Sequence, residues 1–416
     1  MSQSDSRQPP EPLYQGSTQP LYRTPTLSAP APTSAPAQVT QAAYASPVPF
    51  SPPPAKPGSA MLVLTIIGFS LAGLIGILVL LYLVLALGPG GVALGGVLAL
   101  IPLAIVLLGV RWIDRWEPEP APALAFGFLW GAAVAVFGAL FVGLLVEVSA
   151  AMSGGSAAAS EFVSAVIQAP LVEESGKGLG VLLIFLVARK HFDGPVDGVV
   201  YAAVVAGGFA FTENILYFAQ QIGAGSGIAE IFVLRGLMAP FAHVMFTSCT
   251  GIALGIAARR TSTLGAIGIF FVGLIPAILL HALWNGALFI VDDFYGYYFI
   301  VQVPLFLGAV LLVRVLRRKE VAVTRARIAE YAAVGWFAPE EVDALATRAG
   351  RRATKRWAAS HGLGPVMKRY TRDATRLAFT RQRLVTRRAT AGAQAEEAAL
   401  LASIVATRAQ LATPIR

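Results

Sequence analysis

Residues 61–87 read MLVLTIIGFSLAGLIGILVLLYLVLAL, an unbroken apolar stretch without a charged side chain. At a rise of about 1.5 Å per residue, a helix of this length crosses the roughly 30 Å hydrocarbon core of a bilayer. No water is available to the backbone inside that core, so the segment must be helical. The stretch therefore predicts a membrane-spanning helix and sets the fold class.

Further apolar runs of similar length follow the first. The predicted spans are 61–87, 92–110, 121–148, 162–188, 198–219, 230–258, 264–291 and 297–316. The composition agrees with this pattern, because 56% of the residues are hydrophobic, only 13% are charged and the mean hydropathy is +0.67. Soluble domains carry more charge. We predict an all-α polytopic membrane helix bundle with about eight transmembrane helices.

The connectors between these spans alternate in charge. Every second connector is basic, and the connectors between them contain no Lys or Arg. The basic ones contain Arg111 and Arg115, then Arg189 and Lys190, then Arg259 and Arg260, and finally Arg317, Arg318 and Lys319. The positive-inside rule then predicts that both termini are cytoplasmic.

Two polar tails flank the predicted membrane domain at 61–316. Residues 1–60 are rich in Pro, Ser, Gln and Ala, a composition typical of disorder. Residues 317–416 hold 20 of the 32 Lys and Arg residues and are predicted to be mostly helical, with a helix start at Pro339 and a break near Gly362. We expect a solvated basic tail that contacts acidic lipid or an acidic protein, and no nucleic acid.

Spans four to seven carry polar side chains at bilayer depth, where such groups are costly and usually functional. They are Glu173, Glu174 and Lys177 in the fourth span, Glu213 and Asn214 in the fifth, Arg235 and His243 in the sixth, and His281 and Asn285 in the seventh. If these helices pack as a bundle, most of the groups converge. Arg235 lies near the end of its span, where snorkelling to the interface is the favoured interpretation.

Helical spacing suggests how these groups work together. Lys177 follows Glu173 by four residues and Glu174 by three, so it can neutralise one carboxylate. The other carboxylate then suits a general acid or base, although a structural ion-pair network is the alternative. Asn285 shares a helix face with His281 and could hold its ring or donate to an oxyanion.

Two imidazoles and a carboxylate also form a metal-ligand set. His243, His281 and Glu213 would leave an open coordination position for water. A proton- or ion-coupled transporter would use the same buried groups, but no internal repeat is evident in this chain. A membrane scaffold without activity is disfavoured, because the glutamate pair is present.

Five sequence elements occur in a fixed order within 61–316 and together resemble the PrsW family of bacterial intramembrane proteases, within the wider group of CAAX-processing and bacteriocin-processing membrane proteases. The elements are Asp114-Arg115-Trp116-Glu117-Pro118-Glu119-Pro120, Glu173-Glu174-Ser175-Gly176-Lys177, Phe209-Ala210-Phe211-Thr212-Glu213-Asn214, His243, and His281-Ala282-Leu283-Trp284-Asn285. The resemblance implies a bacterial plasma membrane location and hydrolysis of a single-span membrane protein, such as a membrane-anchored anti-sigma factor.

The resemblance also implies roles for individual residues. Glu173 would activate the attacking water and Glu174 would support it, while His281 and Asn285 match the late family element. In the wider group the second motif ends in His, whereas here it ends in Glu213. Two mechanisms therefore stay open. One needs no metal, and the other uses Zn²⁺ held by the two histidines with Glu213 or Glu174.

Overall fold

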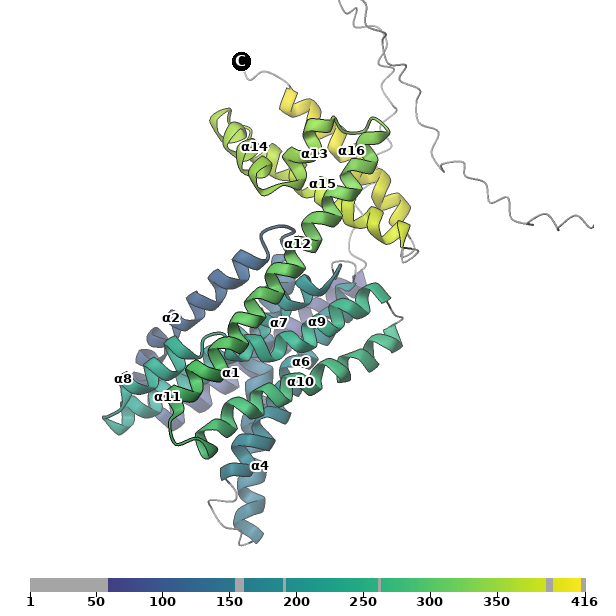
Figure 1. The fold of residues 1–416 in the computed structure, drawn as a ribbon. Helices are drawn as coiled ribbons and strands as arrows, with labels where there is room; N and C mark the ends of the chain where they lie inside the picture. The colour runs from purple at the N-terminus through teal and green to yellow at the C-terminus, as the bar shows by residue number, and fades with distance from the viewer. Residues whose placement is uncertain (1–58, 154–160, 190–191, 261–262, 387–391, 413–416) are drawn as a thin grey trace, which may run out of the picture.

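The computed structural model describes residues 59–153, 161–189, 192–260, 263–386 and 392–412. Over these residues the regular secondary structure consists of helices alone. Figure 1 shows a bundle of long helices, and a smaller group of helices at the end of the bundle from which α12 emerges. The disorder predicted for residues 1–60 falls almost entirely outside the described residues.

The helix boundaries follow the apolar pattern closely; segments marked η are π-helical turns. The bundle contains α1 (Ser59–Leu87), α2 (Pro89–Ile113), α3 (Ala121–Leu129), η1 (Trp130–Ala135), α4 (Val136–Ser153), η2 (Ser164–Gln168), α6 (Ala169–Val187), α7 (Pro195–Ala224), α8 (Ile228–Ile231), η4 (Phe232–Met238), α9 (Ala242–Arg260), α10 (Thr263–Ile290), α11 (Phe294–Tyr297), η5 (Tyr298–Gln302) and α12 (Val303–Ala333). The tail contains α13 (Pro339–Ala346), α14 (Arg348–Ser360), α15 (Gly364–Val385) and α16 (Ala393–Ala412).

Seven helical segments within the described residues are long and apolar enough to cross a membrane, which confirms the predicted polytopic membrane bundle. They are Thr65–Leu87, Pro89–Ile113, Ala121–Met152, Pro195–Ala224, Ile228–Ala258, Leu264–Ile290 and Phe294–Ala333. The remaining predicted span, 162–188, corresponds to η2 and α6. That segment is helical but carries three charged side chains at its centre, and it packs against α4, α7, α9 and α10.

The span predicted as one helix at 230–258 is interrupted in the structure. It consists of α8, the π-helical η4, a short irregular stretch that includes Pro240, and then α9. Proline lacks a backbone N–H and cannot continue the hydrogen-bond ladder. Tyr298 donates to the Met238 carbonyl oxygen at 2.9 Å, which satisfies a carbonyl at the break. π-Helical turns are frequent at functional sites.

α7 is the most buried of the seven apolar segments, and its backbone touches those of its neighbours. A Cβ built on Gly198 of α7 would lie 1.9 Å from the carbonyl oxygen of Gly251 on α9. A Cβ built on Gly131 of η1 would lie 1.9 Å from the Val205 oxygen of α7. Only glycine permits such contacts, which are typical of membrane helix pairs. α7 is therefore held closely against both η1 and α9.

Gly251→Ala is expected to destabilise the bundle, because its methyl group would lie 2.1 Å from the Gly198 carbonyl oxygen. Overpacking of this kind costs about 1–3 kcal/mol, so the thermal unfolding midpoint in detergent should fall. Gly268→Ala on α10 is the matched control, since nothing lies within 4 Å of its added methyl group. Equal midpoints for the two variants would contradict the α7–α9 contact.

The basic tail is a folded helical group rather than a solvated helix. α12 continues beyond the predicted boundary at 316, and α13 begins at Pro339 as the sequence suggests. The end of α12 and α13–α16 share an apolar core that includes Ile328, Leu377 and Ile404. Arg352, Lys355, Arg356, Lys368 and Arg369 are exposed on helices whose inner faces are apolar. The total charge of the tail does not reveal this pattern.

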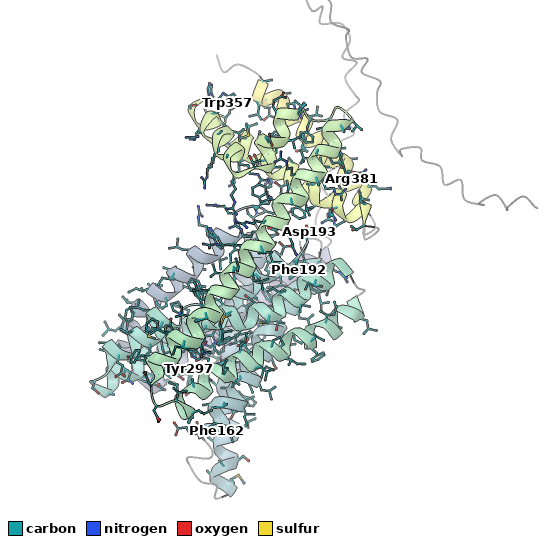
Figure 2. All side chains as sticks on the ribbon, in the orientation of Figure 1. Phe162, Phe192, Asp193, Tyr297, Trp357 and Arg381 are labelled. Carbon is teal, nitrogen blue, oxygen red and sulfur yellow. The ribbon has the colours of Figure 1, made fainter. Side chains whose placement is uncertain are left out.

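The tail docks on the bundle through the connectors that follow α2 and α6. Arg383 forms an ion pair with Asp193 at 2.6 Å, and Figure 2 shows Asp193 where the two parts meet. The Arg351 guanidinium stacks on Trp116 at 3.4 Å from the ring centroid and donates to the Trp116 carbonyl oxygen at 2.9 Å. Burial at this junction raises the pKa of Glu117 well above its ordinary value. The connector motif thus contributes to the attachment of the tail.

Candidate active site

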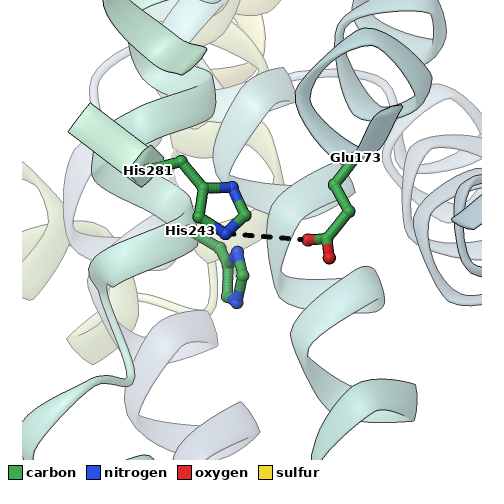
Figure 3. A group of neighbouring side chains, drawn as sticks. All are labelled: Glu173, His243 and His281. Carbon is green, nitrogen blue, oxygen red and sulfur yellow. Dashed lines mark ion pairs between the residues drawn. The ribbon is translucent and has the colours of Figure 1, made fainter. Parts of the chain in front are cut away.

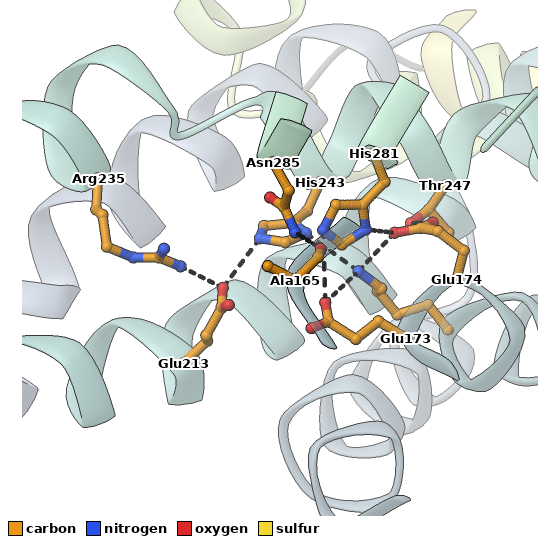
Figure 4. Close-up of polar contacts among 10 residues, drawn as sticks. Ala165, Glu173, Glu174, Glu213, Arg235, His243, Thr247, His281 and Asn285 are labelled. Atoms are coloured by element: carbon orange, nitrogen blue, oxygen red, sulfur yellow. Dashed lines mark hydrogen bonds and ion pairs between the residues drawn. The ribbon is translucent and has the colours of Figure 1, made fainter. Parts of the chain in front are cut away.

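The polar side chains of the four middle spans meet in one buried cluster (Figure 4). They come from α6, α7, η4, α9 and α10, and all of them are buried or partly buried. This is the convergence that the sequence interpretation requires. The catalytic and metal-binding roles assigned to the individual residues remain predictions.

Glu174 is the most fully engaged carboxylate of the cluster. Its side chain is completely buried, with Lys177 Nζ 2.6 Å from Oε1. Thr247 Oγ1 donates to Oε2 at 2.8 Å, and His281 Nδ1 lies 3.1 Å from Oε1. Glu174 therefore holds both a lysine and a histidine in place and is enclosed by these partners.

Glu173 is placed differently, although it precedes Glu174 directly. Lys177 Nζ lies 3.3 Å from Oε2, and the Glu173 side chain is 11% exposed. His281 Nε2 is 3.9 Å from the same oxygen. Because Glu174 accepts at Nδ1 of His281, we assign the proton to Nδ1, which leaves a lone pair on Nε2 facing Glu173.

His243 lies between a cation and a carboxylate. Its Nδ1 is 3.1 Å from Lys177 Nζ, and its Nε2 is 2.9 Å from Glu213 Oε2. An ammonium group can only donate, so we assign Nδ1 as acceptor and Nε2–H as donor to Glu213. The Lys177 ammonium also lies over the Phe209 ring, 4.2 Å from its centroid. Each histidine thus has one nitrogen fixed by a glutamate.

Glu173, His243 and His281 form a group that could hold a metal ion (Figure 3), with their ligand atoms within 4.8 Å of one another. Two imidazoles and one carboxylate with an open position are the donor set of catalytic zinc sites. Carboxylates at the outer nitrogens of the ligating histidines are also typical of such sites, and Glu174 and Glu213 supply them. The donor types present therefore fit a metal centre, in which the ion would replace Lys177 Nζ as the partner of the lone pair on His243 Nδ1.

Glu213, which the sequence interpretation assigns to the metal, is not in this group. Arg235 forms an ion pair with its carboxylate, and Arg235 Nε donates to Asn214 Oδ1 at 3.1 Å. The Arg235 guanidinium also stacks over Tyr217 at 3.9 Å. The expected snorkelling of Arg235 is thus not what the structure shows. Arg235 lies in the π-helical η4, where the regular α-helical period does not predict the direction in which a side chain points.

Two further side chains complete the cluster. Asn285 Nδ2 donates to the Ala165 carbonyl oxygen of η2 at 2.8 Å, so the amide nitrogen ties α10 to η2 instead of holding the His281 ring. Its part in oxyanion binding stays a prediction. Sequence analysis missed Thr247, which contacts Glu174. Its spacing four residues after His243 on α9 was the available signal.

A cavity of about 180 Å³ adjoins the cluster. Glu173 and Glu213 line one side of it, and the other walls are mainly apolar and come from α1, α4 and α7. Of the three carboxylates, Glu174 is absent from its lining. The cavity gives Glu173 access to a molecule that enters from outside the bundle.

Residues 119–309 match the family model described as PrsW family intramembrane metalloprotease. The matched range includes the whole cluster and leaves out α1, α2 and the tail helices. Within the described residues, the part that the family model recognises is therefore the part that builds the candidate site.

Curated relatives are named Protease PrsW. The protein of Clostridioides difficile (strain 630) is 31% identical over 193 residues, 46% of this chain and 78% of the relative. That of Bacillus subtilis (strain 168) is 31% identical over 182 residues, 44% of this chain and 77% of the relative. That of Geobacillus kaustophilus (strain HTA426) is 32% identical over 142 residues, 34% of this chain and 57% of the relative. No solved structure is significantly similar to the chain.

Proposed function

We propose that this chain, which belongs to the PrsW family of intramembrane metalloproteases, hydrolyses its substrate with a water molecule activated by Glu173. The observation that carries the proposal is the position of Glu173. Its carboxylate lies beside two imidazoles and also lines the open cavity, whereas Glu174 is enclosed. Only a carboxylate with access to the cavity can take a proton from a water next to a substrate carbonyl.

In this mechanism the water oxygen attacks the carbonyl carbon of the scissile bond while Glu173 accepts the water proton. Glu173 then returns the proton to the leaving amide nitrogen, so that a free carboxyl group and an amine are formed. His243 and His281 would hold the metal ion, which when bound polarises the carbonyl and acidifies water. Glu174 orients His281, and Glu213 orients His243, through the ring nitrogens that face away from the reaction.

The substrate we propose is a single-span, membrane-anchored protein of the anti-sigma-factor type. The enzyme would lie in a bacterial plasma membrane with both of its termini in the cytoplasm, because every basic connector would then face the cytoplasm. In that orientation α7 runs outward, and Glu213 lies in its outer half. The bond that is cut would be near the outer end of the substrate helix.

Reconstitution tests the proposed function directly. The purified protein, loaded with Zn²⁺ and placed in liposomes with a tagged single-span reporter, should cut the reporter, and mass spectrometry locates the bond. Absence of cleavage together with proton or ion flux across the same liposomes would support a transporter instead. Cleavage that appears equally in liposomes without the protein would assign the activity to a contaminant of the reporter.

A further inference from the structure

The geometry points to a lateral substrate entrance between α1 and α4, which leads to a cavity that receives an apolar substrate side chain beside the scissile bond. This inference rests on the proposed protease function and adds the route and the side-chain preference. The occupant is an unwound segment of a single-span membrane protein.

The cavity joins lipid-facing helices to the reacting groups. Leu83 of α1 and Val136, Ala139 and Leu140 of α4 form apolar walls, and Glu173 lies at the catalytic side. Ala139 and Leu140 are only partly buried, so this wall reaches the surface of the bundle. A substrate residue that enters past α4 therefore arrives next to the carboxylate proposed to activate water.

Other sides of the site are closed by backbone contacts. α7 meets α9 at Gly198 and Gly251, as described above. A Cβ added at Gly273 of α10 would lie 2.5 Å from the Ala253 Cβ of α9, and one added at Gly95 of α2 would lie 2.9 Å from the Ile215 carbonyl oxygen of α7. Helices in such contact cannot separate without losing many close contacts at once. These contacts close the site to a substrate helix at α2, α9 and α10.

α1 is held much more loosely. A Cβ added at Gly76 would find Ala133 Cβ at an ordinary 3.4 Å, and one added at Gly73 would meet nothing within 4 Å. Its buried hydrophobic positions among those described are Ala72, Val79 and Leu83, while much of its remaining surface is exposed and apolar. Lipid tails are as apolar as these side chains, so a shift of α1 has little hydrophobic cost. α1 is therefore the helix that a substrate can displace.

The size and polarity of the cavity define what it accepts. A cavity of about 150 Å³ holds a benzene molecule, so about 180 Å³ is enough for one large aliphatic or aromatic side chain. Glu213 also lines the cavity, but Arg235 already neutralises it. The substrate backbone must be extended here, since a helical peptide bond is enclosed by its own side chains and hydrogen bonds.

Ala139→Leu tests this cavity, with Gly138→Leu as the matched control. A Cβ at Gly138 meets nothing within 4 Å, and this position does not line the cavity. With a reporter that carries Phe beside the mapped scissile bond, Ala139→Leu should lower the cleavage rate by about tenfold or more. Gly138→Leu should cleave at the wild-type rate, and replacement of the reporter Phe by Ala should remove most of the difference between the two variants.

Photocrosslinking provides a readout that does not need activity. With benzoylphenylalanine at Leu140, in a Glu173→Gln background, the reporter should crosslink, whereas the same group at the lipid-exposed Val97 of α2 should not. Two results would overturn the entrance and leave the protease function intact, provided that the wild-type protein cleaves the reporter. One is an equal cleavage rate for Ala139→Leu and Gly138→Leu, and the other is equal crosslinking at Leu140 and Val97. Absence of cleavage by the wild-type protein would reject the protease function itself.

Discussion

Glu173→Gln is expected to slow cleavage of a single-span reporter by about 10²–10⁴-fold, the usual contribution of a general base. Glutamine keeps the shape of the side chain but cannot accept the proton of the attacking water. The rest of the cluster should persist, because Glu174 keeps its contacts with Lys177 at 2.6 Å and with His281 at 3.1 Å. Single-turnover rates in liposomes measure the effect, and thermal unfolding checks the fold.

Glu147→Gln is the matched control for this variant. Glu147 is an exposed residue of α4 and does not line the cavity, so the same chemical change there should leave the cleavage rate unaltered. A Glu173→Gln protein that cuts the reporter at nearly the wild-type rate would contradict the proposed role of Glu173. Equal losses in both variants would point to a general defect of the preparation.

His281→Ala is expected to abolish cleavage and metal binding together, because Nε2 of His281, which faces Glu173, is the nitrogen proposed to hold the metal. Metal content is measured by inductively coupled plasma mass spectrometry on the purified protein. Glu174→Gln should be milder, with a loss of about 10–100-fold in metal affinity, since it disturbs the partner of Nδ1 and leaves Nε2 in place. A chelator should inactivate the wild-type protein, and added Zn²⁺ should restore it.

The metal content of Glu173→Gln separates two roles for that residue. As a base acting on water, Glu173 can be replaced without loss of the metal, and this is the result we expect. Loss of the metal in this variant would make Glu173 a ligand instead. Retention of full metal content by His281→Ala, or cleavage that persists in the chelator, would support the mechanism that uses glutamate alone.

The local properties of the chain were predictable from sequence. Each spanning segment is apolar over enough residues to cross a bilayer, and the start of α13 at Pro339 follows from proline chemistry. The polar residues of the site were recognisable for the same reason, since a charged group within an apolar segment stands out wherever the helix packs. The pairing of Lys177 with the glutamates also needed only helical spacing.

The surroundings of each of these residues were decided by tertiary structure. Glu173 and Glu174 are adjacent in sequence, yet only the packing of α9 and α10 encloses one and leaves the other at the cavity. Arg235, which lies in the π-helical η4, turns inward and pairs with Glu213 of α7. Hydrophobicity acts on each segment separately and can be read along the chain, whereas contacts between helices depend on how side chains far apart in sequence fit together.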